Sequence, residues 1–379
     1  MQSKLPNVGT TIFTIMSQMA QECGAINLSQ GFPDFDCPQR LQQLVTKYLG
    51  AGKNQYPPMA GVPLLRQRIA EKISFHYQYE ADPESEITVT SGATEALFDA
   101  IQAVVRNGDE VIVFDPAYDS YEPAVTLAGG VTVHVPMQEP KYSIDWQRTE
   151  QAINDKTRLI IINSPHNPCG GVLGQEDLDQ LAQLTRDSDI LILSDEVYEH
   201  MVFDGGSHAS VLGHKELRAR SFAVFSFGKT YHVTGWKLAY CVAPEALSSE
   251  FRKVHQFVTF TSTSFLQYAV ADFMAECPEH ATDLPQFYQA KRDRFCELLT
   301  PSRFSFTPSA GTYFQLVDYS AISTLPDTEF ANWLTREKGV AAIPLTPFYQ
   351  TAPDSRIVRF CFCKDDRTLE QAAEILCSL

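Results

Sequence analysis

Seven short apolar runs in the middle of the chain constrain its fold more than any other feature. They occupy residues 87–90, 111–114, 131–135, 159–162, 190–193, 222–225 and 238–242. Runs this short and this apolar are typical of strands covered on both faces, as in a mainly parallel sheet. Helical segments lie between several of the runs, so the alternation predicts an α/β fold.

The two ends of the chain have a different pattern. Apolar residues at helical spacing predict helices over residues 11–22 and 64–73, and the pattern is mostly helical from about residue 265 to 299. Beyond that point we expect strands at 304–306, 311–317 and 357–362, and helices at 328–337 and 369–376. This mixture is typical of a smaller α+β domain.

We therefore predict two domains, which a chain of 379 residues is long enough to form. The large, mainly parallel-sheet domain covers residues 46–285, and the small α+β domain covers residues 286–379. The N-terminal segment, residues 1–45, is expected to join the small domain. No linker composition marks the boundary near residue 285.

The composition argues against several classes of partner. A formal net charge of -16 disfavours binding to nucleic acid or to an anionic membrane. No apolar run approaches the ~18 residues of a membrane span, and we expect no signal peptide. The nine cysteines lack the paired spacing of zinc sites, so we predict reduced thiols, no metal centre and a cytoplasmic location.

A lysine-bearing turn lies between the last two apolar runs. Residues 226–237 contain the hydroxyl of Ser226, the small residue Gly228, the amine of Lys229 and a second cation, Lys237. An amine near a strand end, with anion-binding groups beside it, suits a Schiff base to a phosphorylated aldehyde. A single lysine in a turn is usually exposed, so this interpretation depends on the other motifs.

A phosphate site is indicated after the first run. The turn 91–97 passes directly from the strand at 87–90 into a helix, so Ala93 and Thr94 would present free N–H groups. Such a helix start also has a partial positive charge and binds phosphate readily.

Three further motifs follow apolar runs in the same way. Asp195 follows the run at 190–193, Asn167 lies in the Pro- and Gly-rich loop after 159–162, and Tyr118 follows 111–114. Ligands bind beyond the carboxyl ends of the strands in open parallel sheets. Taken singly, Asp195 could be a helix cap, Tyr118 a core or rim residue and Asn167 a loop residue.

Together these motifs resemble those of the fold-type I, class I aminotransferases, which bind pyridoxal 5'-phosphate (PLP). Within that family the chain is most similar to kynurenine aminotransferase-like enzymes and bacterial methionine aminotransferases, through residues 27–36, 226–235 and 311–314. The resemblance covers essentially the whole chain, with its motifs in family order from Gly31 to Arg359. Gly228, Lys237 and Cys169 stand where many relatives have serine, arginine and threonine.

The resemblance implies a cofactor role for ten residues. Lys229 would carry PLP and move the substrate proton, Asp195 would keep the pyridine nitrogen protonated, and Tyr118 would stack on the ring. Asn167 and Tyr198 would bind its phenolate oxygen. The implied phosphate ligands are Ala93, Thr94, Ser226, Lys237 and, from the neighbouring subunit, Tyr56.

The same resemblance implies a substrate site. Arg359 would bind the substrate carboxylate with its two-pronged guanidinium, assisted by the Gly31 N–H and the Asn167 amide. Phe13, and Phe260 from the partner subunit, would form an apolar wall. The implied assembly is a homodimer with shared active sites.

The sequence thus predicts a PLP-dependent aminotransferase that moves the amino group of methionine or aromatic amino acids to a 2-oxo acid in a ping-pong cycle. Two alternatives keep the fold: a cysteine-conjugate β-lyase, and a kynurenine–oxoglutarate aminotransferase. A non-enzymatic sensor fused to a DNA-binding module fits poorly with the acidic charge. A nicotinamide enzyme lacks its G-x-G-x-x-G signature.

Overall fold

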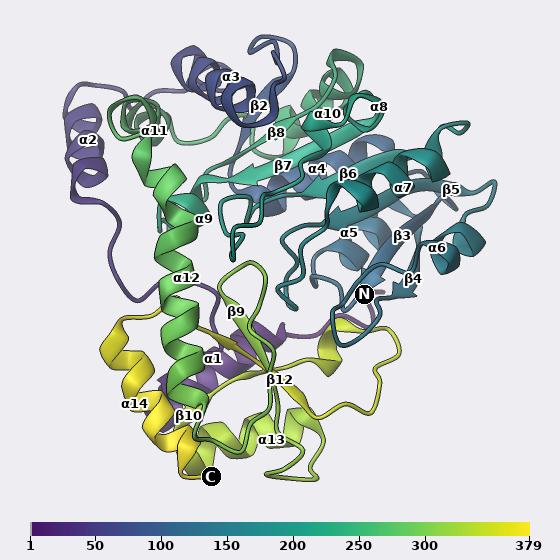
Figure 1. Cartoon of the computed structure of the whole chain (residues 1–379). Helices are drawn as coiled ribbons and strands as arrows, with labels where there is room; N and C mark the ends of the chain where they lie inside the picture. Colours follow the sequence, from purple (N-terminus) through teal and green to yellow (C-terminus); the bar gives the residue numbers. More distant parts are fainter. Residues whose placement is uncertain (1) are drawn as a thin grey trace.

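A seven-stranded sheet forms the centre of the larger part of the molecule (Figure 1). The computed structural model describes residues 2–379. The strand order is β2-β8-β7-β6-β5-β3-β4. The strands are β2 (Ile87–Thr90), β3 (Glu110–Asp115), β4 (Val131–Pro136), β5 (Thr157–Asn163), β6 (Leu191–Asp195), β7 (Ser221–Ser226) and β8 (Ala239–Val242). The seven strands predicted from the central apolar runs are all confirmed, with ends that differ by no more than two residues.

Only β8 runs against the others. The β3–β4, β3–β5, β5–β6 and β6–β7 pairs are parallel, whereas β8 is antiparallel to both β7 and β2. The mainly parallel sheet is therefore confirmed. Because β8 is reversed, its first residue lies at the same edge as the last residue of β7. The segment between them, which contains Lys229 and Lys237, therefore lies at the C-terminal ends of the parallel strands.

Helices cover both faces of this sheet. In β5, Ile160 and Ile162 belong to one apolar core, and Leu159 and Ile161 belong to another. The first core contains side chains of α2 (Gln39–Gly50), α3 (Pro63–Tyr77), α7 (Gln175–Thr185), α8 (Lys215–Arg218) and α11 (Ser264–Glu276), with α6 (Trp146–Ala152) at its margin. The second contains side chains of α4 (Ala93–Val104), α5 (Tyr121–Ala128) and α10 (Glu245–Val258). Burial on both faces explains why the strands are apolar without alternation.

The smaller part contains two short sheets. Strands β11 (Ile343–Pro344), β12 (Ile357–Cys361) and β9 (Phe314–Asp318) form an antiparallel sheet, and β1 (Ile26–Asn27) pairs in parallel with β10 (Val340–Ala341). Helices α1 (Ile12–Cys23), α13 (Asp327–Trp333) and α14 (Asp366–Cys377) pack around them. Helix α12 (Glu279–Leu299) extends between the two parts in Figure 1 and includes residue 285, so the domain limits stay a prediction.

One predicted strand is wrong. Residues 304–306 form only an isolated bridge, in which Ser305 exchanges backbone hydrogen bonds with Asp318 at 3.0 and 2.8 Å. Phe304 is buried, so its apolar character reflects core packing rather than a strand. Pro308 follows closely, and a proline lacks the N–H that a longer ladder would need.

The predicted helix at 328–337 corresponds to α13 and a π-helical turn, Leu334–Lys338, that continues it. Among residues 2–379, no helix is long and apolar enough to cross a membrane.

Candidate active site

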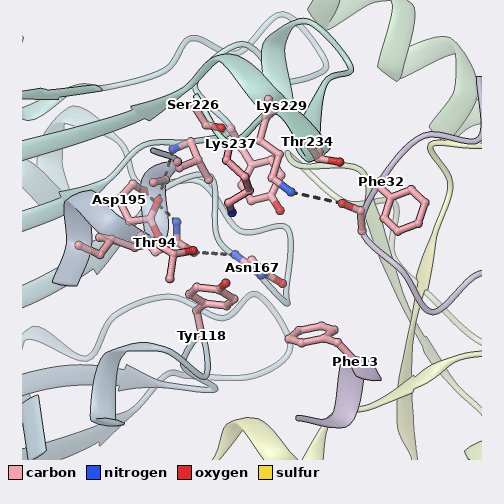
Figure 2. A pocket seen from close by; sticks show the side chains of 18 of the residues that line it. Phe13, Phe32, Thr94, Tyr118, Asn167, Asp195, Ser226, Lys229, Thr234 and Lys237 are labelled. Atoms are coloured by element: carbon pink, nitrogen blue, oxygen red, sulfur yellow. Dashed lines mark hydrogen bonds between the residues drawn. The ribbon is translucent and has the colours of Figure 1, made fainter. Parts of the chain in front are cut away.

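A cavity of ≈ 290 Å³ lies between the sheet edge described above and the smaller part of the molecule. Twelve of the fourteen residues predicted for the site line it: Phe13, Gly31, Ala93, Thr94, Tyr118, Asn167, Asp195, Tyr198, Ser226, Lys229, Lys237 and Arg359. Figure 2 shows Lys229 and Lys237 extending into the space bordered by Asp195, Tyr118 and Asn167. Residues that are distant in the sequence therefore line the same cavity.

The Lys229 amine lies inside this cavity. Lys229 belongs to the short helix α9 (Phe227–Thr230), which directly follows β7. Its Nζ donates hydrogen bonds to the Tyr313 hydroxyl at 2.7 Å and to the Gly31 carbonyl at 3.2 Å. Burial lowers the pKa of Lys229 to about 8, and Arg359 and Lys237 act in the same direction. A substantial fraction of the amine is therefore neutral, and hence nucleophilic, near physiological pH.

Asp195, the last residue of β6, is a buried carboxylate that lines the cavity across from Lys229 (Figure 2). Its Oδ2 accepts a hydrogen bond from the Tyr121 hydroxyl at 2.7 Å, and its Oδ1 accepts one from the Val197 N–H at 3.4 Å. Burial raises the pKa of Asp195 to about 6, although these hydrogen bonds lower it. The carboxylate would be stabilised by a cationic N–H group in the cavity.

One end of the cavity forms where α4 begins. Gly92 precedes the helix with φ 91°, and Ala93 and Thr94 are its first residues. A Cβ at Gly92 would lie 3.0 Å from Lys237 Cε, so a glycine here allows the lysine to lie against the start of the helix. Together with the Ser226 hydroxyl, this arrangement fits a phosphate group.

Arg359 lies in β12, at the end of the cavity lined by Phe13 and Phe314, and is fully buried. Its Nη1 donates to Asn167 Oδ1 at 2.7 Å, and its Nη2 donates to the Ser29 carbonyl at 3.1 Å. Its Nε has no hydrogen-bond partner within residues 2–379. Phe314 and Phe13 stack near the guanidinium, with ring centroids 3.8 and 5.3 Å from Cζ.

Gly31 also lies at this end. A Cβ at this position would lie 2.8 Å from Phe314 Cζ. The segments that contain Gly31 and Phe314 can therefore approach this closely only with a glycine at residue 31. The Gly31 carbonyl accepts hydrogen bonds from Lys229 and Tyr313. Binding of a carboxylate by its N–H stays a prediction.

Tyr56 and Phe260, the two residues expected to act from a partner subunit, lie outside this cavity. Their side chains are 84% and 44% exposed and contact each other edge to face, with ring centroids 5.5 Å apart. Phe257 and Val258 are also exposed nearby in sequence, at 86% and 50%. Exposed apolar groups of this kind are characteristic of protein interfaces.

Sequence reasoning missed several residues of the site. The most important are Tyr121, which contacts Asp195, and Tyr313, which contacts Lys229. Tyr313 lies in the segment 311–314, which carried the family resemblance, but no role was assigned to it. The cavity is also lined by Gly228 of the predicted lysine turn and by residues to which no role was given: Gln30, Phe32, Gly92, Leu97, Asn163, Val197, Thr234, Leu238 and Phe314.

A lysine amine, a buried carboxylate, a helix start suited to phosphate and a buried arginine surround one cavity, as expected of a PLP-dependent enzyme acting on amino acids. Residues 24–376 match the sequence model of the family "Aminotransferase class I and II", and the chain belongs to this family. The predicted fold, PLP cofactor and aminotransferase activity are thereby confirmed, and amino acids and 2-oxo acids are its substrate classes.

Three relatives illustrate the similarity. The methionine aminotransferase of Escherichia coli is 53% identical over 99% of this chain and 97% of its own, and its solved structure, YbdL, superposes with a TM-score of 0.98. The N-succinyldiaminopimelate aminotransferase structure from Mycobacterium tuberculosis is 37% identical, covers 100% of this chain and 99% of its own, and has a TM-score of 0.97. Human kynurenine–oxoglutarate transaminase 3 is 34% identical over 98% of this chain and 89% of its own.

Proposed function

We propose that this aminotransferase uses methionine or an aromatic amino acid as its amino donor. The observation that carries the proposal is the aromatic surrounding of Arg359, formed by Phe13, Phe314 and Phe348. The arginine supplies a cation for the carboxylate common to all donors, while the rings suit an uncharged side chain. The similarity to the Escherichia coli methionine aminotransferase supports the same choice.

The cofactor-binding residues divide between the two ends of PLP. Ala93, Thr94, Ser226 and Lys237 would hold its phosphate, and Tyr118, Asn167, Asp195 and Tyr198 would hold its ring. When bound, PLP supplies an aldehyde carbon for the amino group and a ring that accepts electrons from the substrate Cα. Asp195 would keep a proton on the pyridine nitrogen, because a buried carboxylate favours a neighbouring cation.

Lys229 and Arg359 would act on the substrate. Arg359 would fix the carboxylate through two N–H groups, with help from Gly31 and Asn167, and thereby orient the bond from Cα to its hydrogen. The Lys229 amine, once free, would take the proton from Cα as a general base. Its lowered pKa makes the neutral form available near physiological pH.

Steady-state kcat/KM over a panel of amino donors tests the proposal. Methionine or aromatic donors should exceed aspartate by at least about tenfold, because aspartate would bury an unpaired carboxylate among the rings. Comparable values for aspartate and methionine would overturn the proposed specificity and leave the aminotransferase activity intact. Kynurenine belongs in the panel, because the human relative is a kynurenine–oxoglutarate transaminase.

Substitutions at Phe13 and Arg359 should separate side-chain recognition from carboxylate recognition. Arg359→Ala should weaken every donor alike, by ~2–5 kcal/mol in kcat/KM, the usual cost of removing one member of a buried charge pair. Phe13→Ala should impair methionine and phenylalanine but leave alanine nearly unchanged. Donor panels on both variants would make this comparison. An equal effect of Phe13→Ala on alanine would contradict its assignment to the side-chain wall.

We further propose that the chain forms a homodimer in which Tyr56 and Phe260 complete the partner's site. We propose a cytoplasmic location for this dimer. Both side chains are exposed and lie outside their own chain's cavity, which supports action in trans. Lys229→Ala chains mixed with Tyr56→Ala chains should form heterodimers with one intact site. Activity should then exceed the sum of the two parents after subunit exchange, and an additive result would rule out the shared site.

A cysteine-conjugate β-lyase on the same scaffold remains the second candidate. It would cleave the Cβ–S bond of a cysteine conjugate with water and release a thiol, pyruvate and ammonia without any 2-oxo acid acceptor. Measuring both products in the absence of an acceptor decides between the two reactions. Turnover that requires the acceptor supports the aminotransferase.

A further inference from the structure

A buried cluster of three ionisable side chains lies next to the start of α4, outside the groups assigned above. Glu95 and Asp99 come from α4, and His255 comes from α10. His255 and Asp99 are fully buried, and the Glu95 side chain is 7% exposed. His255 Nδ1 lies 2.8 Å from Glu95 Oε1 and 3.5 Å from Asp99 Oδ2, and its Nε2 lies 3.1 Å from the Met59 carbonyl.

The hydrogen-bond partners fix the protonation state of His255. The Met59 carbonyl can only accept, so Nε2 must carry a hydrogen. An ionised Glu95 can also only accept, so Nδ1 must carry one too, and the ring is an imidazolium. Burial alone would lower the pKa of His255, but Asp99 and Glu95 raise it to about 9. Burial opposes ionisation of Glu95 as well, yet the contact with His255 lowers the pKa of that carboxyl group.

A bound metal ion explains these distances less well. The ligand atoms of one tetrahedral zinc lie roughly 3.3 Å apart, given bonds of about 2.0 Å. The 2.8 Å between His255 Nδ1 and Glu95 Oε1 is instead an ordinary hydrogen-bond length.

The position of Glu95 gives this cluster a consequence for phosphate binding. Glu95 is the third residue of α4, and its Oε2 accepts a hydrogen bond from the Ser91 N–H in the turn that precedes the helix. An uncompensated carboxylate here would oppose a phosphate at the helix start. Through Met59, the same histidine also contacts the segment that contains Tyr56.

We propose that His255 is a positioning residue for the phosphate end of the PLP site. Its imidazolium faces the carboxyl groups of both Glu95 and Asp99 and offsets negative charge next to the helix start. It also keeps the Glu95 side chain against the Ser91 N–H, and it connects the first turn of α4 to the segment before Val62. The proposal rests on the phosphate site proposed above. It assigns His255 no contact with cofactor or substrate.

Comparing PLP with pyridoxal, which lacks the phosphate, tests this role directly. The full-length chain, freed of cofactor, is dialysed to equilibrium against graded PLP in one series and graded pyridoxal in another, and bound cofactor is read from its absorbance. In His255→Gln, the ratio of PLP affinity to pyridoxal affinity should fall about tenfold, the size of one charge effect at a partly buried helix end. His214→Gln, which changes the N-cap histidine of α8 outside the cavity, should leave the ratio unchanged.

A second substitution shows whether charge is the cause. In the double variant His255→Gln/Glu95→Gln the carboxylate is also removed, and the ratio should recover most of the loss. An unchanged ratio in His255→Gln, or equal weakening of PLP and pyridoxal, overturns the proposal. The proposal is also overturned if the wild-type protein contains one equivalent of zinc and the His255→Gln variant contains none. If His255→Gln does not fold, Glu95→Gln alone should raise the ratio, and a fall would contradict the proposal.

Lys237→Ala distinguishes this proposal from the phosphate site on which it rests. That variant should lower the ratio by removing a direct phosphate ligand. A lowered ratio in Lys237→Ala with an unchanged ratio in His255→Gln rejects the role of His255 alone. Unchanged ratios in both variants reject the phosphate site itself.

Discussion

Replacing Lys229 by alanine should abolish transamination, with kcat lowered by at least about 10⁴-fold, the upper end of the contribution of a positioned acid or base. The variant would lose both the amine that bonds to PLP and the base beside the substrate Cα. The buried ring of Tyr313 and the close packing at Gly31 should keep the cavity intact. Kinetics of the purified variant with methionine and a 2-oxo acid provide the measurement.

Chemical labelling checks the same assignment without relying on activity. Borohydride reduction of the wild-type holoenzyme, followed by peptide mapping, should place the pyridoxyl group on Lys229. Lys237→Ala is the matched control, because it removes the other lysine of the cavity and should leave the label on Lys229. Label on a different residue would refute the assignment.

The attachment of PLP should also depend on pH in a defined direction. Only the neutral amine can attack an aldehyde, and burial lowers the pKa of Lys229 to about 8. The rate of cofactor attachment should therefore rise as the pH rises through about 8 and level off above it. An ordinary exposed lysine would still be rising near pH 10. Stopped-flow absorbance of PLP uptake would distinguish the two profiles.

The placement of Lys229 and Asp195 could be predicted because it depends on local signals. Both follow continuous apolar runs, and the carboxyl ends of neighbouring parallel strands lie at one edge. The direction of β8 could not be predicted in the same way, because a short apolar run has the same composition in either direction. Because β8 is reversed, Lys237, which precedes it, lies at the C-terminal ends of the parallel strands, where the cavity is.

Contacts between the two parts of the molecule required more than local patterns. Arg359 lies in a separate sheet, and only the family resemblance connected it with Asn167. Tyr121 and Tyr313 were missed because their roles depend on side-chain contacts with Asp195 and Lys229, not on spacing. The error at residues 304–306 has a related origin, since core packing of Phe304 produced a strand-like pattern.

The second large effect is expected at Asp195. Asp195→Asn preserves the shape of the side chain and an oxygen for the Tyr121 hydroxyl, but removes the negative charge. Without that charge the pyridine nitrogen should lose its proton, and the ring should accept electrons from the substrate Cα less well. We expect kcat to fall by about 10²–10³-fold, as for other preorganised polar groups, while most of the PLP affinity remains.

Tyr121→Phe serves as the matched control for Asp195. It removes the 2.7 Å hydrogen bond but leaves the charge, so the effect should be about tenfold or less. The same hydrogen bond lowers the pKa of Asp195, so its loss should raise that pKa in the cofactor-free chain. Near-normal kcat in Asp195→Asn at saturating PLP would show that the carboxylate positions the cofactor without controlling its charge. A loss in Tyr121→Phe as large as in Asp195→Asn would instead assign the effect to geometry.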